Sequence, residues 1–281
     1  MDLDELRASQ NVEDRRGGFG GFGRPLMIGG GGLGTVAVVL AAMFFGVDPS
    51  QLLDAGGDAP ATQNQPDNSA RTDNAAYTFS RKIIGSAEDV WSPLLAAKGV
   101  RFAPATFTVY DYTTPTGCGT GQSSAGPFYC PNDAHIYLDL SFFDELTQRF
   151  GASGDFARAY IIAHEYGHHI QNLLGTMDRQ PTQAEGAGGG SVRTELQADC
   201  YAGVWAFHAN EQFHILQTGD VDEGLRAARA VGDDTLQKEQ QGYIVPDSFT
   251  HGTSAQRSRW FRRGLAAGDM NACDTFSAGT L

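Results

Sequence analysis

The stretch that decides the fold is residues 155–174, DFARAYIIAHEYGHHIQNLL. Asp155 predicts the start of a helix and Gly175 predicts its end, and apolar residues recur between them at helical spacing. His164 and His168 lie one turn apart on one helix face, the separation at which two histidines can bind one Zn²⁺. Ionisable groups within an apolar helix are costly to bury without partners, and a metal ion would supply one.

The same helix contains an HExxH motif, HEYGH at residues 164–168. Glu165 points to the side of the metal position, where it is a candidate general base that takes a proton from a zinc-bound water. Gly167 is unfavourable inside a helix and therefore indicates close backbone packing. The longer metzincin motif is excluded, because it requires Gly and His where this chain has Gln171 and Leu174. A chance His/Glu/His on a solvated helix face is the alternative, and the apolar context disfavours it.

A second helical pattern, residues 191–206 (SVRTELQADCYAGVWA), carries Glu195 and Asp199 one turn apart. Glu195 is the predicted third ligand, since two histidines and a glutamate with an open position for water are a catalytic zinc arrangement. Asp199 is predicted to accept the second N–H of a ligating histidine and so to fix its tautomer. The alternative, a solvated acidic face, is disfavoured because the neighbouring residues are apolar.

Composition limits the class of protein and its partners. A chain of 281 residues can bury a sizeable core, and a formal net charge of −13 argues against nucleic acid as a partner. The four cysteines match no CxxC motif, so they are either disulfide-bonded or buried thiols. Cys118 and Cys130 flank a short loop and are predicted to form a bridge. Cys200 and Cys273 are the candidate second pair.

The front of the chain divides into three predicted segments. Residues 1–25 are polar and Gly-rich and are expected to be disordered. Residues 26–47 are uncharged over a length close to the roughly 20 residues that span a bilayer, which predicts one transmembrane anchor. A flexible linker, for the Gly-rich first half, and a cleaved signal peptide are the alternatives. Residues 48–74 are rich in Asp, Asn, Gln and Pro and predict a flexible linker.

Charge placement around residues 26–47 predicts a membrane topology. Arg15, Arg16 and Arg24 precede the apolar segment, and the next basic residue after it is Arg71. The positive-inside rule therefore predicts a cytoplasmic N-terminus and a catalytic domain on the other side of the membrane. That exterior is oxidising in bacteria, which favours disulfides between the four cysteines.

Residues 75–281 predict one mainly helical α+β domain with a small antiparallel sheet. Further helices are expected in 75–98, in 221–241 and from Thr253 or Ser254 onward. Strands are expected in 102–112 and 134–140, separated by a loop rich in Gly, Thr, Pro and Ser. The strand at 134–140 is expected to offer an edge to which an extended peptide adds.

His251 lies on a predicted loop just before the last helix. It is a candidate stabiliser of the oxyanion that forms in a tetrahedral intermediate, and Arg257 is a second candidate. A capping or surface role is the alternative for His251. The other histidines are expected on surface or core positions without a catalytic role: His135, His169, His208 and His214.

Motifs along nearly the whole chain resemble those of one bacterial family, the putative neutral zinc metallopeptidases. They are NVEDRR (11–16), TGCG (116–119), GPFYCP (126–131), HEYGHH (164–169), ELQADCYAGVW (195–205) and VPDSFTHGT (245–253). The resemblance implies a zincin-type domain in the bacterial envelope, with zinc bound by His164, His168 and Glu195 and with Glu165 as the base. The connector at residues 176–190 departs from the family pattern, because it is Gly-rich and shorter than expected, and the rim of the cleft is therefore not predicted.

These observations together predict a zinc endopeptidase anchored in the bacterial inner membrane by residues 26–47. Its catalytic domain, residues 75–281, would act on protein or peptide substrates on the periplasmic or extracytoplasmic side. Two alternatives remain open: a non-catalytic envelope binding protein with a vestigial or structural zinc site, and a zinc hydrolase of a non-peptide bond. Structural zinc sites are usually closed by four protein ligands, whereas three are evident in this sequence.

Overall fold

A computed structural model describes residues 1–17, 75–179 and 184–281. Its helices are α3 (Ala75–Ala97), α4 (Phe142–Gln148), α5 (Asp155–Leu173), α6 (Thr176–Arg179), α7 (Gly190–Phe213), α8 (Asp220–Ala230), α9 (Asp233–Gln241) and α10 (Ser254–Ala267). Its strands are β1 (Val12–Asp14), β2 (Thr106–Val109), β3 (Thr113–Thr116), β4 (Gly119–Gln122), β5 (Phe128–Cys130) and β6 (His135–Leu138). Short 3-10 turns follow at η2 (Ser123–Ala125), η3 (Pro246–Ser248) and η4 (Met270–Cys273). The described chain is mainly helical with small sheets, the α+β class that the sequence predicts.

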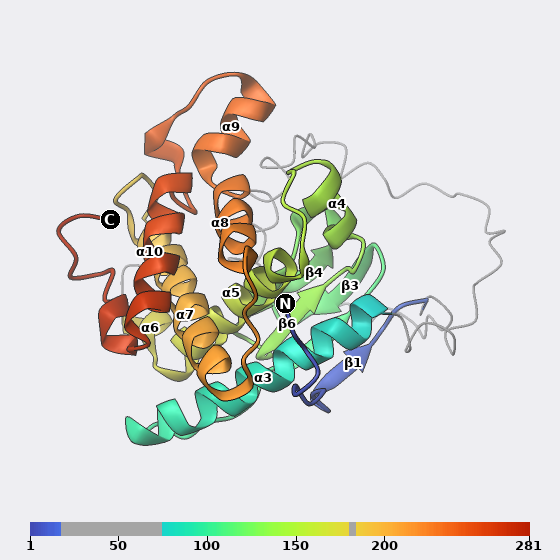
Figure 1. Cartoon of the computed structure of the whole chain (residues 1–281). Helices are drawn as coiled ribbons and strands as arrows, with labels where there is room; N and C mark the ends of the chain where they lie inside the picture. Colours follow the sequence, from blue (N-terminus) through green and yellow to red (C-terminus); the bar gives the residue numbers. More distant parts are fainter. Residues whose placement is uncertain (18–74, 180–183) are drawn as a thin grey trace, which may run out of the picture.

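Helix α5 lies between the sheet and the C-terminal helices (Figure 1). It packs against α7, α8 and α3 and also contacts β5. Helix α10 packs on α7 and α8 and completes the helical part of the fold. The helix with the HExxH motif is therefore the centre of the core, which explains why it is apolar on nearly all sides.

Local sequence signals set the ends of α5. Gly154 is its N-cap with φ of 112°, and Gly175 follows its C-cap with φ of 68°, a left-handed conformation that favours glycine. Gly167 allows α7 to approach, because a Cβ at this position would lie 2.9 Å from the carbonyl oxygen of Ala198. The close backbone packing predicted for Gly167 is thus confirmed, and it brings the site residues of the two helices together.

The main sheet has the strand order β1-β2-β6-β5. Strand β2 pairs in parallel with both β1 and β6, and only β5 and β6 are antiparallel. The prediction of an antiparallel sheet is therefore wrong for most of this sheet, since helix α3 returns the chain from β1 so that β2 runs in the same direction. A separate antiparallel hairpin, β3–β4, lies within the segment that was predicted as a loop.

The strand predicted as the edge for peptide addition, β6, is an internal strand. It has β2 on one side and β5 on the other, so its backbone is already paired. The edge next to the helical layer is β5, whose Tyr129 contacts α5 through its hydroxyl group. The prediction failed because alternation in a single strand does not reveal how many neighbours the strand has.

Two helix predictions also change in detail. Residues 75–97 form one helix that contains Pro93, and the segment 221–241 forms two helices separated near Gly232. A Cβ added at Gly232 would lie 2.5 Å from the backbone nitrogen of Ser254. The chain therefore turns at Gly232, where it meets the start of α10. The predicted start of α10 is confirmed, with Thr253 and Gln256 forming a capping box.

Residues 1–17 are ordered, so the expectation of disorder is wrong for this part of the N-terminal segment. Leu6 is buried, β1 joins the sheet beside β2, and Arg7 forms ion pairs with Glu88 and Asp89 of α3. The order comes from partners that are distant in sequence, which a local composition signal does not report. Residues 18–25, the predicted anchor at 26–47 and the predicted linker at 48–74 lie outside the described residues. No helix in the described ranges has both the length and the apolarity needed to cross a bilayer.

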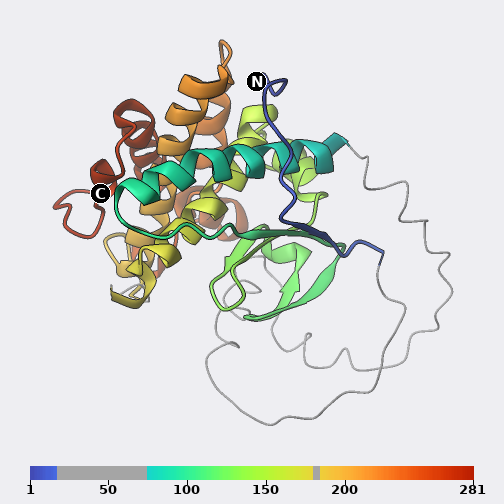
Figure 2. The ribbon, with the colours of Figure 1, turned by 90° about the horizontal axis from the view of Figure 1, so that it is seen from below.

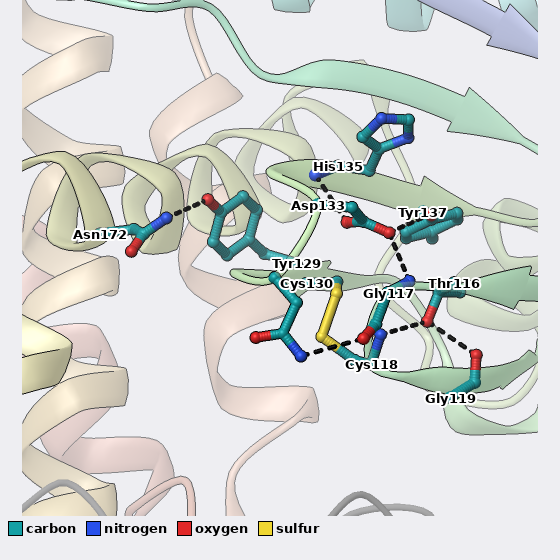
Figure 3. Close-up of a disulfide and its surroundings, with 11 residues drawn as sticks. Thr116, Gly117, Cys118, Gly119, Tyr129, Cys130, Asp133, His135, Tyr137 and Asn172 are labelled. Carbon is teal, nitrogen blue, oxygen red and sulfur yellow. Dashed lines mark hydrogen bonds between the residues drawn. A yellow bond between two sulfur atoms is a disulfide. The ribbon is translucent and has the colours of Figure 1, made fainter. Parts of the chain in front are cut away.

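Both predicted disulfides are present. Cys118–Cys130 joins the β3–β4 turn to β5, and Figure 3 shows this bridge beside Tyr129, which reaches Asn172 of α5. Cys200–Cys273 joins α7 to η4 near the C-terminus across a sequence separation of 73 residues. No cysteine is free. Each bridge therefore fixes a segment that packs against one of the two site helices.

Candidate metal centre

Helices α5 and α7 bring the three predicted ligands together. One possible ligand atom from each of His164, His168 and Glu195 lies within 4.8 Å of the other two. The Nε2 atom of His164 is 3.1 Å from one oxygen of Glu195, and the Nε2 atom of His168 is 3.4 Å from the other. Within the described residues, this is the group of His, Cys, Asp and Glu side chains with the spacing to hold a metal ion.

The hydrogen bond behind His164 fixes which ring nitrogen faces Glu195. The Nδ1 atom of His164 is 2.8 Å from Asp199, and because a carboxylate only accepts, this nitrogen carries the proton and donates. In the neutral ring that binds a metal, the lone pair of Nε2 then points toward the ligand cluster. Asp199 therefore has the position that the sequence predicts for it.

Asp199 is itself held by two buried donors, Tyr160 and Arg257. The Tyr160 hydroxyl donates a short hydrogen bond to Oδ1, and the Arg257 guanidinium donates to both carboxylate oxygens at 2.9 and 3.0 Å. Burial alone would raise the pKa of Asp199, but Arg257 and then His164 lower it to about 2. The carboxylate thus stays ionised with four donors around it. Arg257 is 3% exposed and is engaged with Asp199, so it orients that carboxylate rather than facing a substrate.

His168 is oriented by a relay of two glutamines. Gln171 donates through Nε2 to the carbonyl of Thr194 at 2.8 Å and to the side-chain oxygen of Gln197 at 3.0 Å. Its own oxygen is therefore free to accept from Nδ1 of His168, at 2.8 Å, which leaves the Nε2 lone pair of His168 toward Glu195. Gln197 in turn donates to the carbonyl of Cys273 at 2.9 Å, next to the second disulfide.

Electrostatics favour an ionised third ligand. Burial would raise the pKa of Glu195, but His168 and His164 keep it well below its usual value. In the metal-free protein, burial lowers the pKa of His164, yet Asp199 and Glu195 raise it to about 10 overall. Without a metal, His164 therefore holds a proton between two carboxylates, and a cation would replace that proton.

Glu165 is the one acidic residue of the site without a protein partner. It is 8% exposed, and no hydrogen bond or ion pair to its carboxylate occurs within residues 1–17, 75–179 and 184–281. Burial raises the pKa of Glu165, although His164 and His168 act in the opposite direction. Buried carboxylates normally have a partner, so one without any fits a site completed by a cation and the groups it binds. The donor set and this carboxylate fit Zn²⁺.

His251 lies at the edge of the cluster on a loop fixed by Asp233. The buried carboxylate of Asp233 accepts from the backbone N–H groups of Thr250, His251 and Gly252 at 2.7–2.9 Å. The His251 ring is 3.3 Å from the same carboxylate and 38% exposed. Burial lowers the pKa of His251, but Asp233 and Glu195 raise it overall. His251 is thus a half-buried histidine that Asp233 fixes on its loop, with a pKa raised above its ordinary value.

The structure therefore brings the three predicted ligands together with Asp199 behind His164, and it adds four residues to the site. Tyr160, Gln171, Gln197 and Asp233 were not predicted. Two of them had a usable signal, because Tyr160 precedes His164 by one turn and Gln171 follows His168 by three residues. The remaining histidines contact other groups: His169 donates to the carbonyl of Ala103, His208 donates to that of Gly268, His214 ends α7, and His135 neighbours Thr108 and Glu13.

Comparison with known proteins agrees with this site. The family model described as putative neutral zinc metallopeptidase matches residues 1–276, so the chain belongs to that family. It is 47% identical to the uncharacterized protein YpfJ of Escherichia coli K12 over 282 aligned residues, which cover 96% of each chain. It is 43% identical to the uncharacterized protein Rv2575 of Mycobacterium tuberculosis H37Rv over 257 residues, which cover 85% of this chain and 86% of that one. No solved structure matches the chain.

Proposed function

We propose that this protein is a zinc-dependent endopeptidase that acts outside the cytoplasm. The observation that carries the proposal is Glu165, a buried carboxylate without a protein partner, placed directly beside an open His₂Glu ligand set. A structural zinc site would be closed by a fourth protein ligand, and within the described residues the cluster has three. An open position next to an unpaired carboxylate is what metal-assisted hydrolysis needs.

The proposed roles follow from the contacts of each residue. His164, His168 and Glu195 would hold the Zn²⁺ ion, which when bound acts as a Lewis acid and lowers the pKa of water. Glu165 accepts the proton of the attacking water and passes it to the leaving amine, and its raised pKa brings it closer to the pH at which it must do both. His251, held by Asp233, donates a hydrogen bond to the developing oxyanion.

An extended peptide is the substrate that the sheet favours. Strand β5 is one of the two edges of the main sheet and packs on α5 through Tyr129, whose hydroxyl accepts from Asn172 at 2.9 Å. A peptide that adds to β5 would pair with it through backbone hydrogen bonds, which give affinity without a sequence requirement. The Cys118–Cys130 bridge ends β5 and holds this edge strand in place (Figure 3).

The two disulfides support the proposed compartment. Structural disulfides form and persist in oxidising surroundings such as the bacterial periplasm and cell exterior, and they are rare in the cytoplasm. We therefore place the folded domain outside the cytoplasm, with attachment to the inner membrane through residues 26–47 as the proposed form of anchoring. Those residues lie outside the described ranges, so the anchoring rests on their apolar sequence alone.

The test is a Glu165→Gln variant compared with a matched Glu239→Gln control, which changes an exposed glutamate of α9. Both proteins are loaded with zinc and incubated with a mixed peptide library, and products are identified by mass spectrometry. We expect internal cleavage by the parent and the control, and a loss of at least about 10²-fold in Glu165→Gln with zinc content unchanged. Equal cleavage by Glu165→Gln would refute the role of Glu165. Zinc binding without any cleavage would favour a binding protein or a hydrolase of another bond.

A further inference from the structure

The N-terminal segment is built into the same sheet as the catalytic domain. Strand β1 pairs in parallel with β2, with Val12 opposite Phe107 and Asp14 opposite Val109. The pairing continues beyond the strand, since Phe107 donates to the carbonyl of Asn11 and Arg15 donates to that of Val109, each at 2.8 Å. Because β2 also pairs with β6, residues 11–15 belong to the sheet that supports α5.

Helix α3 has a surface shaped for residues 7–11. The buried carboxylate of Glu88 accepts from Arg7 at 2.7 Å, from Ser9 at 2.6 Å and from Asn11 at 2.9 Å. Without the segment, this carboxylate would lose all three donors. Gly85 lies directly beneath the segment, because a Cβ there would be 2.3 Å from the carbonyl oxygen of Arg7. Both features of α3 are explained by a docked N-terminal segment.

The segment also contacts the helical layer. Asp2 donates from its backbone nitrogen to the carbonyl of Ile215 at 2.9 Å, and Lys82 donates to the carbonyl of Leu3 at 2.8 Å. Figure 2 shows the blue segment crossing the cyan helix α3 on its way to the sheet. Residues 1–17 therefore bridge both layers of the domain.

We propose that residues 1–17 and the catalytic domain lie on the same side of any membrane that the chain contacts. A single crossing between Gly17 and Ala75 would place β1 and β2 on opposite sides of the bilayer and would break the sheet. The pairing of β1 with β2 and a single membrane crossing between Gly17 and Ala75 therefore exclude each other. This topology replaces the single-pass topology expected from the arginines before residue 26. An attachment to the membrane through residues 26–47 would then have to leave both ends of that segment on the same side.

The arginines themselves support the new topology. The positive-inside argument counts charges beside an apolar segment, but two of its three arginines have structural partners. Arg16 is 4% exposed, pairs with Asp14 at 2.6 Å and lies over the ring of Tyr77. Arg15 pairs with Glu13 at 2.7 Å and donates to the carbonyl of Pro115 at 2.8 Å. Their positive charge is thus explained by the fold rather than by an orientation signal.

The first test uses two single-cysteine variants of the full chain, Gln10→Cys and Gln240→Cys, both at exposed positions. All four native cysteines are in disulfides, so each variant has one reactive thiol. Bacterial spheroplasts that express each variant are treated with a membrane-impermeant maleimide before or after lysis. We expect the two positions to behave alike, both labelled in intact spheroplasts or both labelled only after lysis. Labelling of one position but not the other in intact spheroplasts would overturn the proposal.

A second test asks whether the segment is docked in the membrane-isolated protein. Trypsin cleavage after Arg16 is followed by mass spectrometry in the parent, in Gly85→Val and in a Gly279→Val control at an open, exposed position. We expect cleavage in Gly85→Val to be at least about tenfold faster than in the parent and the control, because the added side chain displaces the segment. Equally fast cleavage in the parent and Gly85→Val would show that the segment is not docked, and the proposal would fail.

Discussion

The buried ion pair between Asp199 and Arg257 gives the sharpest prediction about stability. Asp199 is fully buried and Arg257 is 3% exposed, and the guanidinium donates to both carboxylate oxygens. Asp199→Asn removes the charge with almost no change in volume. Three donors, from Tyr160, His164 and Arg257, converge on Oδ1, so the amide oxygen should occupy that position. The amide nitrogen then replaces Oδ2 and faces Nε of Arg257, so that two hydrogen-bond donors meet and neither has an acceptor.

The magnitude follows from the cost of a buried charge that has lost its partner. Breaking a buried ion pair on one side costs about 3–5 kcal/mol, a large part of the roughly 5–15 kcal/mol that holds a domain folded. For a chain of this size each kcal/mol lowers Tm by about 2–4 °C, so we expect Asp199→Asn to lower Tm by about 6–20 °C. Tm is measured by circular dichroism on metal-free protein, so that loss of metal does not contribute.

The double variant Asp199→Asn/Arg257→Met provides the control. It removes both charges and keeps an unbranched side chain in the place of the arginine. We expect it to regain at least half of the lost stability, since replacing both partners of a buried pair is often close to neutral. A loss below about 1 kcal/mol in Asp199→Asn, or strictly additive losses in the double variant, would refute the account of this pair.

Three further predictions concern the metal and the oxyanion. Gln171→Leu removes the hydrogen-bond acceptor of His168 and should weaken zinc affinity about 10–100-fold. Competition with a chromogenic chelator measures the affinity, and an unchanged value would contradict the relay. Zinc binding at pH 7 should release about one proton, because the pKa of His164 is about 10 without metal and His164 must lose that proton to bind zinc. Zinc affinity should therefore rise with pH. Calorimetry in buffers of different ionisation enthalpy measures the proton release, and the absence of any release would contradict the prediction. His251→Ala should lower kcat about 10²–10³-fold at unchanged zinc content, and unchanged kcat would remove His251 from the mechanism.

Local signals in the sequence predicted the helices that build the site. Residues 155–174 combine helical spacing with glycines at both ends, and α5 covers 155–173. Glu195 and Asp199 could be placed because one helical turn separates them, as it separates His164 and His168. Spacing along one helix is a local property, and local properties are visible in a single sequence.

Partners that are distant in sequence were not predictable in the same way. Asp233 holds His251 across 18 residues, and no spacing rule connects a helix start with a loop of that kind. The order of residues 1–17 depends on Glu88 and on the β2 backbone, so the polar composition of the segment was misleading. The position of 134–140 inside the sheet depends on β2 and β5 together. Each of these features is decided by tertiary contacts.

The contacts of residues 1–17 also determine which length of the chain should be used in experiments. A fragment that begins at residue 75 would lack β1 and the donors of Glu88, so it would expose the β2 edge and leave a buried carboxylate unpaired. Metal and activity measurements should therefore use chains that keep residues 1–17.

The most direct test of the central claim is the zinc content of the full chain, purified without chelators and measured by plasma mass spectrometry. We compare the parent with Glu195→Ala and with a Glu239→Ala control on the exposed face of α9. The account predicts one zinc ion per chain in the parent and the control, and a marked loss in Glu195→Ala. A folded, zinc-supplied parent without zinc, or full zinc content in Glu195→Ala, would contradict the assignment of His164, His168 and Glu195 as the metal site.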